Sequence, residues 1–140
     1  MRTIPFLLLA LCASAFGSYR ADTQLIVDVQ NIKEVKGQLR VGLYKPCDNF
    51  PSGCKPIANQ IVAVKGNSTR ITFTVPPGDY AVALFHDVND NGEMDKKMFG
   101  IPKEPYGFSN NYRPRVSAPD FDDCRVKVET SGKTISIKLI

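Results

Sequence analysis

The chain has 140 residues, of which 43% are hydrophobic and 23% are charged, and its formal net charge is +4. This length corresponds to one ordinary domain, and the apolar content excludes a wholly disordered chain. The 10 glycines and 10 prolines leave few stretches for long helices. Basic residues such as Lys33, Arg40 and Lys65 stand singly, so we expect no nucleic-acid partner.

The first residues resemble an export signal. Arg2 supplies a positive start, residues 4–13 form an apolar stretch, and Ala13-Ser14-Ala15 has the small-x-small form of a cleavage site. The apolar stretch is shorter than the ~20 residues that span a bilayer, and no later segment is a candidate for spanning one. We expect residues 1–15 to be removed, with cleavage near 15–21. Residues 22–140 should then form one domain in the periplasm or outside the cell.

Three cysteines, Cys47, Cys54 and Cys124, lie beyond the expected cleavage site. An exported chain meets an oxidising environment, where disulfides persist. Cys47 and Cys54 flank a loop that is flexible enough to bring them together, so we predict this disulfide and a buried Cys124 thiol. The cysteine spacing is not C-x-x-C and the only histidine is far away in sequence, which disfavours a metal site of cysteines.

Apolar and polar residues alternate with a period of two through almost the whole expected domain. The alternation predicts strands near residues 24–30, 39–44, 61–64, 71–75, 80–87, 124–128 and 135–139. Turn residues such as Pro76-Pro77-Gly78-Asp79 separate these segments. About seven short strands predict an all-β fold, a single antiparallel β-sandwich, with a small barrel as the alternative.

A long irregular loop is predicted over residues 88–120, after the most hydrophobic strand. It contains four prolines. Loops of about 30 residues inside a compact domain are uncommon and usually carry function. We therefore expect the chemistry of this chain to lie between Asp87 and Pro119.

Oxygen-bearing side chains recur at alternate positions at the start of this loop, which reads DVNDNGEMD from Asp87. Calcium takes about six to eight oxygen ligands, and the spacing matches the start of an EF-hand loop. The position of the usual bidentate glutamate holds Met98, so weak affinity is expected. The alternative is an Asn-Gly turn with exposed acids and no ion. The predicted calcium ligands are Asp87, Asn89, Asn91, Asp95 and, through its carbonyl, Glu93; no organic cofactor is expected.

His86 directly precedes the acidic loop. A metal ligand or a general base is the functional interpretation, but the sequence offers neither further imidazoles nor an obvious nucleophile motif. We favour a structural histidine at a strand end, whose ring bonds to the long loop. We therefore expect no enzyme, and the alternative is a hydrolase that uses His86 and Asp87.

Aromatic, amide and basic side chains follow between Phe99 and Arg113. Aromatic faces combined with amide groups suit a carbohydrate or peptide ligand. Alternatively, Phe99, Ile101, Tyr106 and Phe108 cap one end of the sandwich and anchor the loop. The residues assigned to ligand binding or to loop anchoring are His86, Tyr106, Phe108, Asn110, Asn111, Tyr112 and Arg113.

Several of these motifs occur together in one bacterial family. The run from Pro77 to Asp87 leads into Asn89-Asp90-Asn91-Gly92, and then to Gly100-Ile101-Pro102 and Tyr106-Gly107-Phe108-Ser109-Asn110-Asn111. Over residues 25–140 the chain resembles the exported family DUF2141. The resemblance implies a signal peptide, a transthyretin-like or immunoglobulin-like β-sandwich and no established activity. The loop between Cys47 and Cys54 departs from the family pattern.

We expect an exported, non-catalytic β-sandwich that binds calcium structurally and acts as a small binding or envelope-associated module. Its partner would be a carbohydrate, a peptide or an envelope protein. One alternative is an enzyme on a transthyretin-like scaffold. The other is an accessory subunit of a surface complex, recognised through the aromatic loop or an edge strand.

Overall fold

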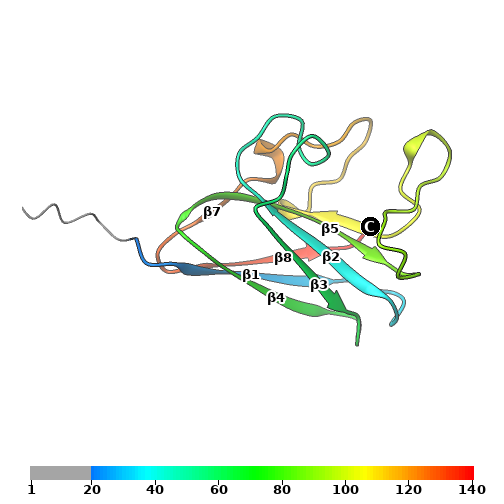
Figure 1. The fold of residues 1–140 in the computed structure, drawn as a ribbon, viewed down its shortest axis with the longest axis horizontal. Helices are drawn as coiled ribbons and strands as arrows, with labels where there is room; N and C mark the ends of the chain where they lie inside the picture. Colours follow the sequence, from blue (N-terminus) through cyan, green and yellow to red (C-terminus); the bar gives the residue numbers. More distant parts are fainter. Residues whose placement is uncertain (1–19) are drawn as a thin grey trace, which may run out of the picture.

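The computed structural model describes residues 20–140, which form two β-sheets packed face to face (Figure 1). The predicted signal peptide, residues 1–15, lies outside the described residues. Within residues 20–140 no helix is long and apolar enough to cross a membrane. The strands are β1 (Thr23–Gln30), β2 (Gln38–Tyr44), β3 (Ala58–Ala63), β4 (Thr69–Val75), β5 (Gly78–Asp87), β6 (Tyr106–Phe108), β7 (Val126–Val128) and β8 (Lys133–Lys138), with 3-10 turns η1 (Met98–Gly100), η2 (Ser109–Asn111) and η3 (Asp122–Cys124).

The smaller sheet has the strand order β4-β1-β8, and the larger sheet has the order β3-β2-β5-β6, with β7 paired to the start of β5. β1 is antiparallel to β4, where Leu25 faces Phe73, but parallel to β8, where Leu25 faces Lys133. The predicted all-β sandwich is confirmed, and its purely antiparallel pairing is wrong at this one pair. β8 enters its sheet from β7 in the opposite layer, so no hairpin forces it to run antiparallel to its neighbour.

Alternate residues of the strands fill the space between the two sheets, as the period of two predicts. In β1, Leu25, Val27 and Val29 are buried while the residues between them are only partly covered. Burying one such side chain contributes about 1.5–3 kcal/mol, so this layer supplies most of the stability. Its largest fully buried members include Tyr80, Leu39, Leu43, Ile137, Leu139, Val41, Val82 and Val128.

A second hydrophobic cluster lies on the outer face of the larger sheet. Phe50 packs edge to face against Tyr44, Phe108 and Phe121, with ring centroids 5.1 to 6.1 Å apart. Such pairs add about 0.5–1.5 kcal/mol each to the burial energy. The buried free thiol of Cys124 belongs to the same cluster, as predicted.

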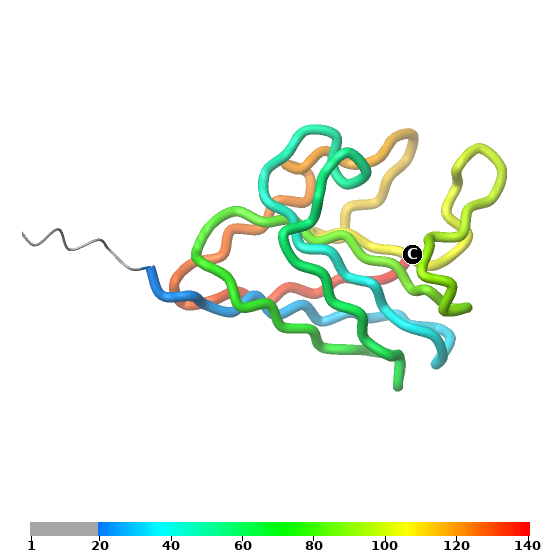
Figure 2. Tube along the Cα trace, viewed as in Figure 1, coloured from blue at the N-terminus to red at the C-terminus, as the bar shows by residue number. Residues whose placement is uncertain are grey.

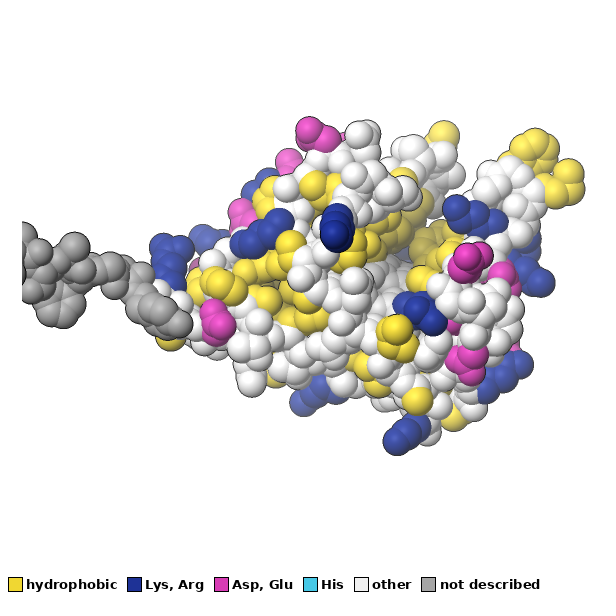
Figure 3. All heavy atoms as spheres, viewed as in Figure 1, with side chains coloured by type: hydrophobic (Ala, Val, Ile, Leu, Met, Phe, Trp, Pro, Cys, Tyr) yellow, Lys and Arg dark blue, Asp and Glu magenta, His cyan; other side chains and the backbone are white. Residues whose placement is uncertain are grey.

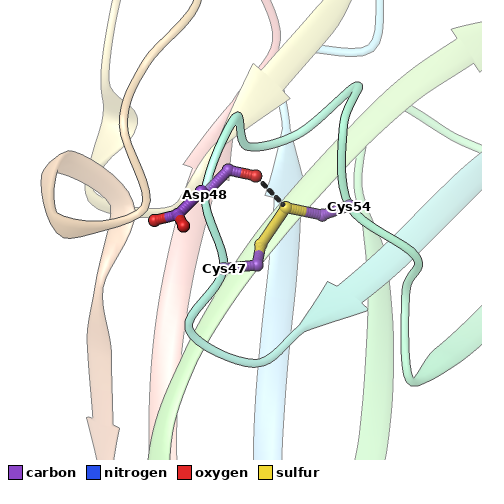
Figure 4. The surroundings of a disulfide bond; sticks show 3 residues. All are labelled: Cys47, Asp48 and Cys54. Carbon is purple, nitrogen blue, oxygen red and sulfur yellow. Dashed lines mark hydrogen bonds between the residues drawn. A yellow bond between two sulfur atoms is a disulfide. The ribbon is translucent and has the colours of Figure 1, made fainter.

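The loop that carries Phe50 is closed by the predicted disulfide between Cys47 and Cys54 (Figure 4). Inside it, the Cys54 Sγ atom lies 3.1 Å from the carbonyl oxygen of Asp48. The backbone N–H of Gly53 donates to the carbonyl of Asn49 at 2.7 Å, which tightens the turn. The disulfide therefore holds a compact loop, residues 47–54, over part of the outer face.

The segment predicted as one irregular loop, residues 88–120, contains a strand. β6 pairs with β5 so that Gly107 faces Leu84. The sequence could not show it, because a strand of three residues is too short to display alternation. The rest of the segment projects from the same side of the larger sheet as the disulfide loop (Figure 2). We call residues 92–103 the first arm and residues 112–118 the second arm.

Candidate functional site

A groove of about 840 Å³ lies on the outer face of the larger sheet. Its floor is formed by β2 and β5, where the small residues Gly42 and Ala83 face each other and leave room above the sheet. Its walls are the disulfide loop, the first arm and the second arm. Figure 3 shows the hollow between the projecting parts.

The floor depends on the glycine in β2. A Cβ atom at Gly42 would lie 2.9 Å from the ring of Tyr44, so only glycine lets this ring lie across the strand. Burial raises the pKa of Tyr44, which keeps its hydroxyl protonated. With Phe85 and Tyr106, this ring gives the groove an aromatic part.

The charge inside the groove is positive. Its lining residues in the described chain include Arg40 and Lys96 but no aspartate or glutamate. The Nε atom of Arg40 donates to Oδ2 of Asp87 at 2.9 Å. Within residues 20–140, the two terminal guanidinium nitrogens of Arg40 donate to no protein acceptor, so they remain available to a ligand.

Asp87 is the fully buried partner that holds Arg40 in place. Burial acts to raise the pKa of Asp87, but hydrogen bonds from Arg40, the Gly92 N–H, Gln38 and the Asn91 N–H outweigh it. The pKa therefore lies below its usual value, and the carboxylate stays ionised. It fixes the guanidinium on one side and the start of the acidic loop on the other.

The acidic loop is held together by hydrogen bonds between its own side chains. The Nδ2 groups of Asn89 and Asn91 donate to the two carboxylate oxygens of Asp95, each at 2.8 Å. The oxygen of Asn91 in turn accepts the backbone N–H of Glu93 at 2.9 Å. These turns are the local structures that asparagine favours.

The predicted calcium ligands are thus neighbours, but they already bond to one another. Within residues 20–140, no three histidine, cysteine, aspartate or glutamate side chains are grouped so as to hold a metal ion. Asp87 is engaged with Arg40, so the carboxylate for the ion would have to come from the partly exposed Asp95. Calcium binding stays a prediction, and it requires Asn89 and Asn91 to turn their amide oxygens toward the ion.

Glu104 supports the base of the first arm, a role that nothing in the sequence indicated. Its side chain is buried, and its two oxygens accept the backbone N–H groups of Val88 at 2.9 Å and Asp95 at 3.1 Å. Between Lys103 and Pro105 a single glutamate reads as a surface charge. In the fold it ties together the two ends of the acidic loop.

His86 is buried in β5 and does not line the groove. Its Nε2 atom lies 2.7 Å from the carbonyl oxygen of Lys36, so Nε2 carries the proton and donates it. The expected ring contact with the long loop is therefore wrong, because Lys36 belongs to the turn between β1 and β2. The backbone N–H of His86 donates to the carbonyl of Pro105 in the long loop. Among residues 20–140, the buried Nδ1 atom has no hydrogen-bond partner.

The residues of the aromatic loop separate into two groups. Phe108 is buried in the outer cluster, while Tyr106 and Phe108 both line the groove. Phe99 is 94% exposed and Ile101 is 56% exposed, so the expectation that they cap the sandwich is wrong. The first arm turns back on itself through its own backbone hydrogen bonds and carries both side chains away from the core.

The two asparagines after β6 anchor the chain to the sheets. Asn110 donates to the carbonyls of Asp123 and Arg125, and Asn111 bonds to the backbone of Ser136 and Lys138. Both asparagines have positive φ angles, 61° and 52°, which asparagine tolerates better than most residues. Tyr112 packs against the outer cluster, and Arg113 is exposed.

Ser109 was absent from the predicted set, although it is a fully buried polar side chain. Its Oγ atom accepts the backbone N–H of Val82 at 3.0 Å and donates to the carbonyl oxygen of Cys124. The hydroxyl therefore satisfies two backbone groups from segments that do not pair directly. A serine between Phe108 and Asn110 gives no periodic signal by which this could be found.

Two sheets packed face to face, with a walled groove on the outer face of the larger one, define a β-sandwich domain. The chain belongs to DUF2141, a family described as uncharacterized proteins conserved in bacteria, whose model matches residues 27–136. The match begins in β1 and ends in β8, so it includes the groove and both arms. No curated protein and no solved structure matches the chain.

Proposed function

We propose that this protein is an exported, non-catalytic binding module that holds a small amphiphilic anion in the groove of the larger sheet. The observation that carries the proposal is the lining itself, which in the described chain contains Arg40, Lys96 and aromatic residues but no carboxylate. The carboxylate that pairs with Arg40, that of Asp87, is fully buried and does not line the groove. Pockets of a few hundred to about 1,000 Å³ with few polar groups suit small molecules.

Arg40 is suited to bind a carboxylate or a similar planar anion. A guanidinium can donate two parallel hydrogen bonds to such a group. Because Nε is already bonded to the buried Asp87, the side chain loses less rotational freedom when a ligand binds. The neighbouring Lys96 adds a second positive charge at the groove.

The apolar part of the ligand would lie against the aromatic side chains. Tyr44, Phe85 and Tyr106 line the groove, and so do Ile101 of the first arm and Ala118 of the second. Neutral carbohydrates and peptides are the alternative ligands. Within residues 20–140, Lys96 forms no ion pair and the terminal nitrogens of Arg40 donate to no acceptor, which favours an anion over either of these.

Two reactive side chains lie away from the groove, which supports a role in binding rather than catalysis. His86 is 1% exposed, and Cys124 is 0% exposed. Burial and the charge of Asp123 raise the pKa of the Cys124 thiol to about 12, so it carries no thiolate at neutral pH. The disulfide is compatible with an exported protein in the periplasm or outside the cell, because disulfides persist in oxidising compartments.

Amide NMR titration with phenylbutyrate tests the proposal, with phenylbutanol and phenylbutylamine as the neutral and cationic analogues. We expect phenylbutyrate to shift the amides of Gly42 and Ala83, and to bind about tenfold more tightly than the alcohol, because its hydrogen bonds are charge-assisted. If none of the three compounds shifts a groove amide, the proposed site is wrong. If all three bind alike, the groove binds ligands but does not select anions.

Two variants assign the selectivity to particular residues. Arg40→Lys keeps a positive charge beside Asp87 but removes the forked donor, so the preference for phenylbutyrate over phenylbutanol should disappear while the fold is kept. The matched control is Arg70→Gln, since Arg70 also pairs with an aspartate, Asp28, but lies in β4 of the smaller sheet. Its titration should be unchanged.

A further inference from the structure

The tips of the two arms carry apolar side chains that the fold does not use. Met98 is 78% exposed and Phe99 94% exposed in the first arm, and Val116 is 100% exposed in the second. Figure 3 shows hydrophobic side chains at the tips of both projecting arms. Exposed apolar groups gathered in this way mark interaction surfaces.

The backbone of the first arm holds its tip outward without help from packing. The N–H of Lys97 donates to the carbonyl of Ile101 at 2.7 Å, and the N–H of Lys103 donates to the carbonyl of Asp95 at 2.8 Å. At the turn, Phe99 has a φ angle of 61°, in the left-handed region that a bulky residue seldom adopts. The backbone of the first arm therefore fixes the position of the apolar tip, and the buried Glu104 holds the base of the arm.

Basic residues flank both tips, while the acidic residues of the first arm, Glu93 and Asp95, precede Lys96 on the side of its base. Residues 96–118 contain five basic residues, and the one acidic residue among them, Glu104, is buried and bonded to the backbone. Within residues 20–140, none of the five basic side chains forms an ion pair. All five are exposed: Lys96, Lys97, Lys103, Arg113 and Arg115.

We propose that the two arms dock this protein on an anionic lipid bilayer. Apolar tips that enter the headgroup boundary gain hydrophobic burial, and basic side chains around them are attracted to lipid phosphates. Neither tip is shaped by neighbouring side chains, and the two tips belong to separate segments. A fluid bilayer can accommodate both tips wherever they lie, whereas a rigid protein partner would need a separate complementary surface for each tip.

This inference does not depend on which ligand the groove binds, but it predicts where the groove lies relative to a membrane. Residues of both arms line the groove, including Phe99 and Val116. Docking by the tips brings the groove to the bilayer surface. The two proposals can fail separately, because one is tested with soluble compounds and the other with vesicles.

Vesicle co-sedimentation tests the inference. The chain from Arg20 onward is used, because both sheets lie within the described residues and the apolar stretch of residues 4–13 could bind lipid by itself. We expect it to sediment with vesicles of phosphatidylcholine and phosphatidylglycerol in low salt, and to remain in solution with phosphatidylcholine alone. High salt should release it, since screening weakens the electrostatic part.

Substitutions at the tips distinguish insertion of these apolar side chains from non-specific hydrophobic adsorption to the vesicles. Met98→Ser with Phe99→Ser should lower the partition coefficient at least about tenfold, because the insertion term is lost. The matched control is Val35→Ser with Ile57→Ser, which removes two apolar side chains that are 59% and 52% exposed outside the arms. All four positions are exposed, so each variant should keep its fold.

A second pair of variants separates local charge from net charge. Replacing Lys96, Lys97 and Lys103 by glutamine should weaken binding by about fivefold per charge. Replacing the exposed Lys33, Lys65 and Lys133 by glutamine changes the net charge equally and should have little effect. The inference is overturned by no sedimentation with anionic vesicles, by equal binding to neutral vesicles, or by control variants that lose as much binding as the arm variants.

Discussion

The Nε atom of Arg40 lies 2.9 Å from Oδ2 of Asp87, and this ion pair joins the floor of the groove to the start of the acidic loop. The aspartate is fully buried, whereas the arginine side chain is 27% exposed. One residue is therefore structural and the other is available to a ligand. Asp87 is the first residue of the segment that resembles a calcium-binding loop, but in the structure its carboxylate pairs with the guanidinium of Arg40.

Asp87→Asn should destabilise the protein by about 3 kcal/mol, because it leaves the Arg40 charge without its buried partner. Folding lowers the pKa of Asp87 below its usual value of 3.8. The stabilisation is therefore full above that value and is lost as the pH falls through the lower pKa of the folded state. Urea unfolding at a series of pH values measures this, and the difference between wild type and variant should shrink in acid.

Asp90→Asn is the matched control for this measurement. Asp90 lies in the same loop but is exposed, and asparagine tolerates its positive φ of 56°. Its free energy of unfolding should stay within about 0.5 kcal/mol of the wild type. An equal loss in both variants would show that the ion pair is not the cause.

Ser109→Ala should cost about 2 kcal/mol, because the Val82 N–H and the Cys124 carbonyl would be left buried without their common partner. Thermal or urea unfolding gives the value. Ser117→Ala, at an exposed position in the second arm, should be nearly neutral. A neutral Ser109→Ala would mean that water or another group takes over both bonds.

Cys124 should resist alkylation in the folded protein. Its pKa is raised from 9.0 to about 12, which lowers the thiolate fraction about a thousandfold near pH 8. Iodoacetamide followed by mass spectrometry should label this cysteine only in denaturant. Labelling of the native protein at the rate of a free thiol would contradict the burial of Cys124.

The calcium prediction has a measurable outcome that distinguishes its ligands. If Asp95, Asn89 and Asn91 coordinate calcium, millimolar calcium should raise the Tm. This concentration matches the affinity of weak extracellular calcium sites. Asp95→Asn should abolish that rise while removing only exposed hydrogen bonds. A Tm that calcium does not change in the wild type would contradict the prediction.

The strands and the disulfide could be predicted because their signals are local. The alternation of Leu25, Val27 and Val29 with polar residues places one face of β1 in the core, and the short loop between Cys47 and Cys54 favours their pairing. The pairing of β1 with β8 could not be predicted in this way. It depends on how the chain crosses between layers, which no local pattern records.

The groove could not be predicted for a similar reason. Arg40 looked like an isolated charge in a strand, and its ion pair forms only because the pairing of β2 with β5 brings Asp87 within reach, opposite Gln38. Glu104 gave no signal beyond its charge. Phe99 gave a misleading one, because an aromatic residue in a long loop is expected to be buried, and only the backbone turn of the first arm shows that it is not.

The parallel pairing of β1 with β8 also affects when the domain can fold. Leu25 finds its neighbour Lys133 only after nearly all of the chain has been made, so the central strand of the smaller sheet has an open edge until then. Such distant pairing raises the contact order and slows folding. Until β8 is present, the smaller sheet consists of β1 and β4 alone, so the core between the two layers is completed by the last strand of the chain.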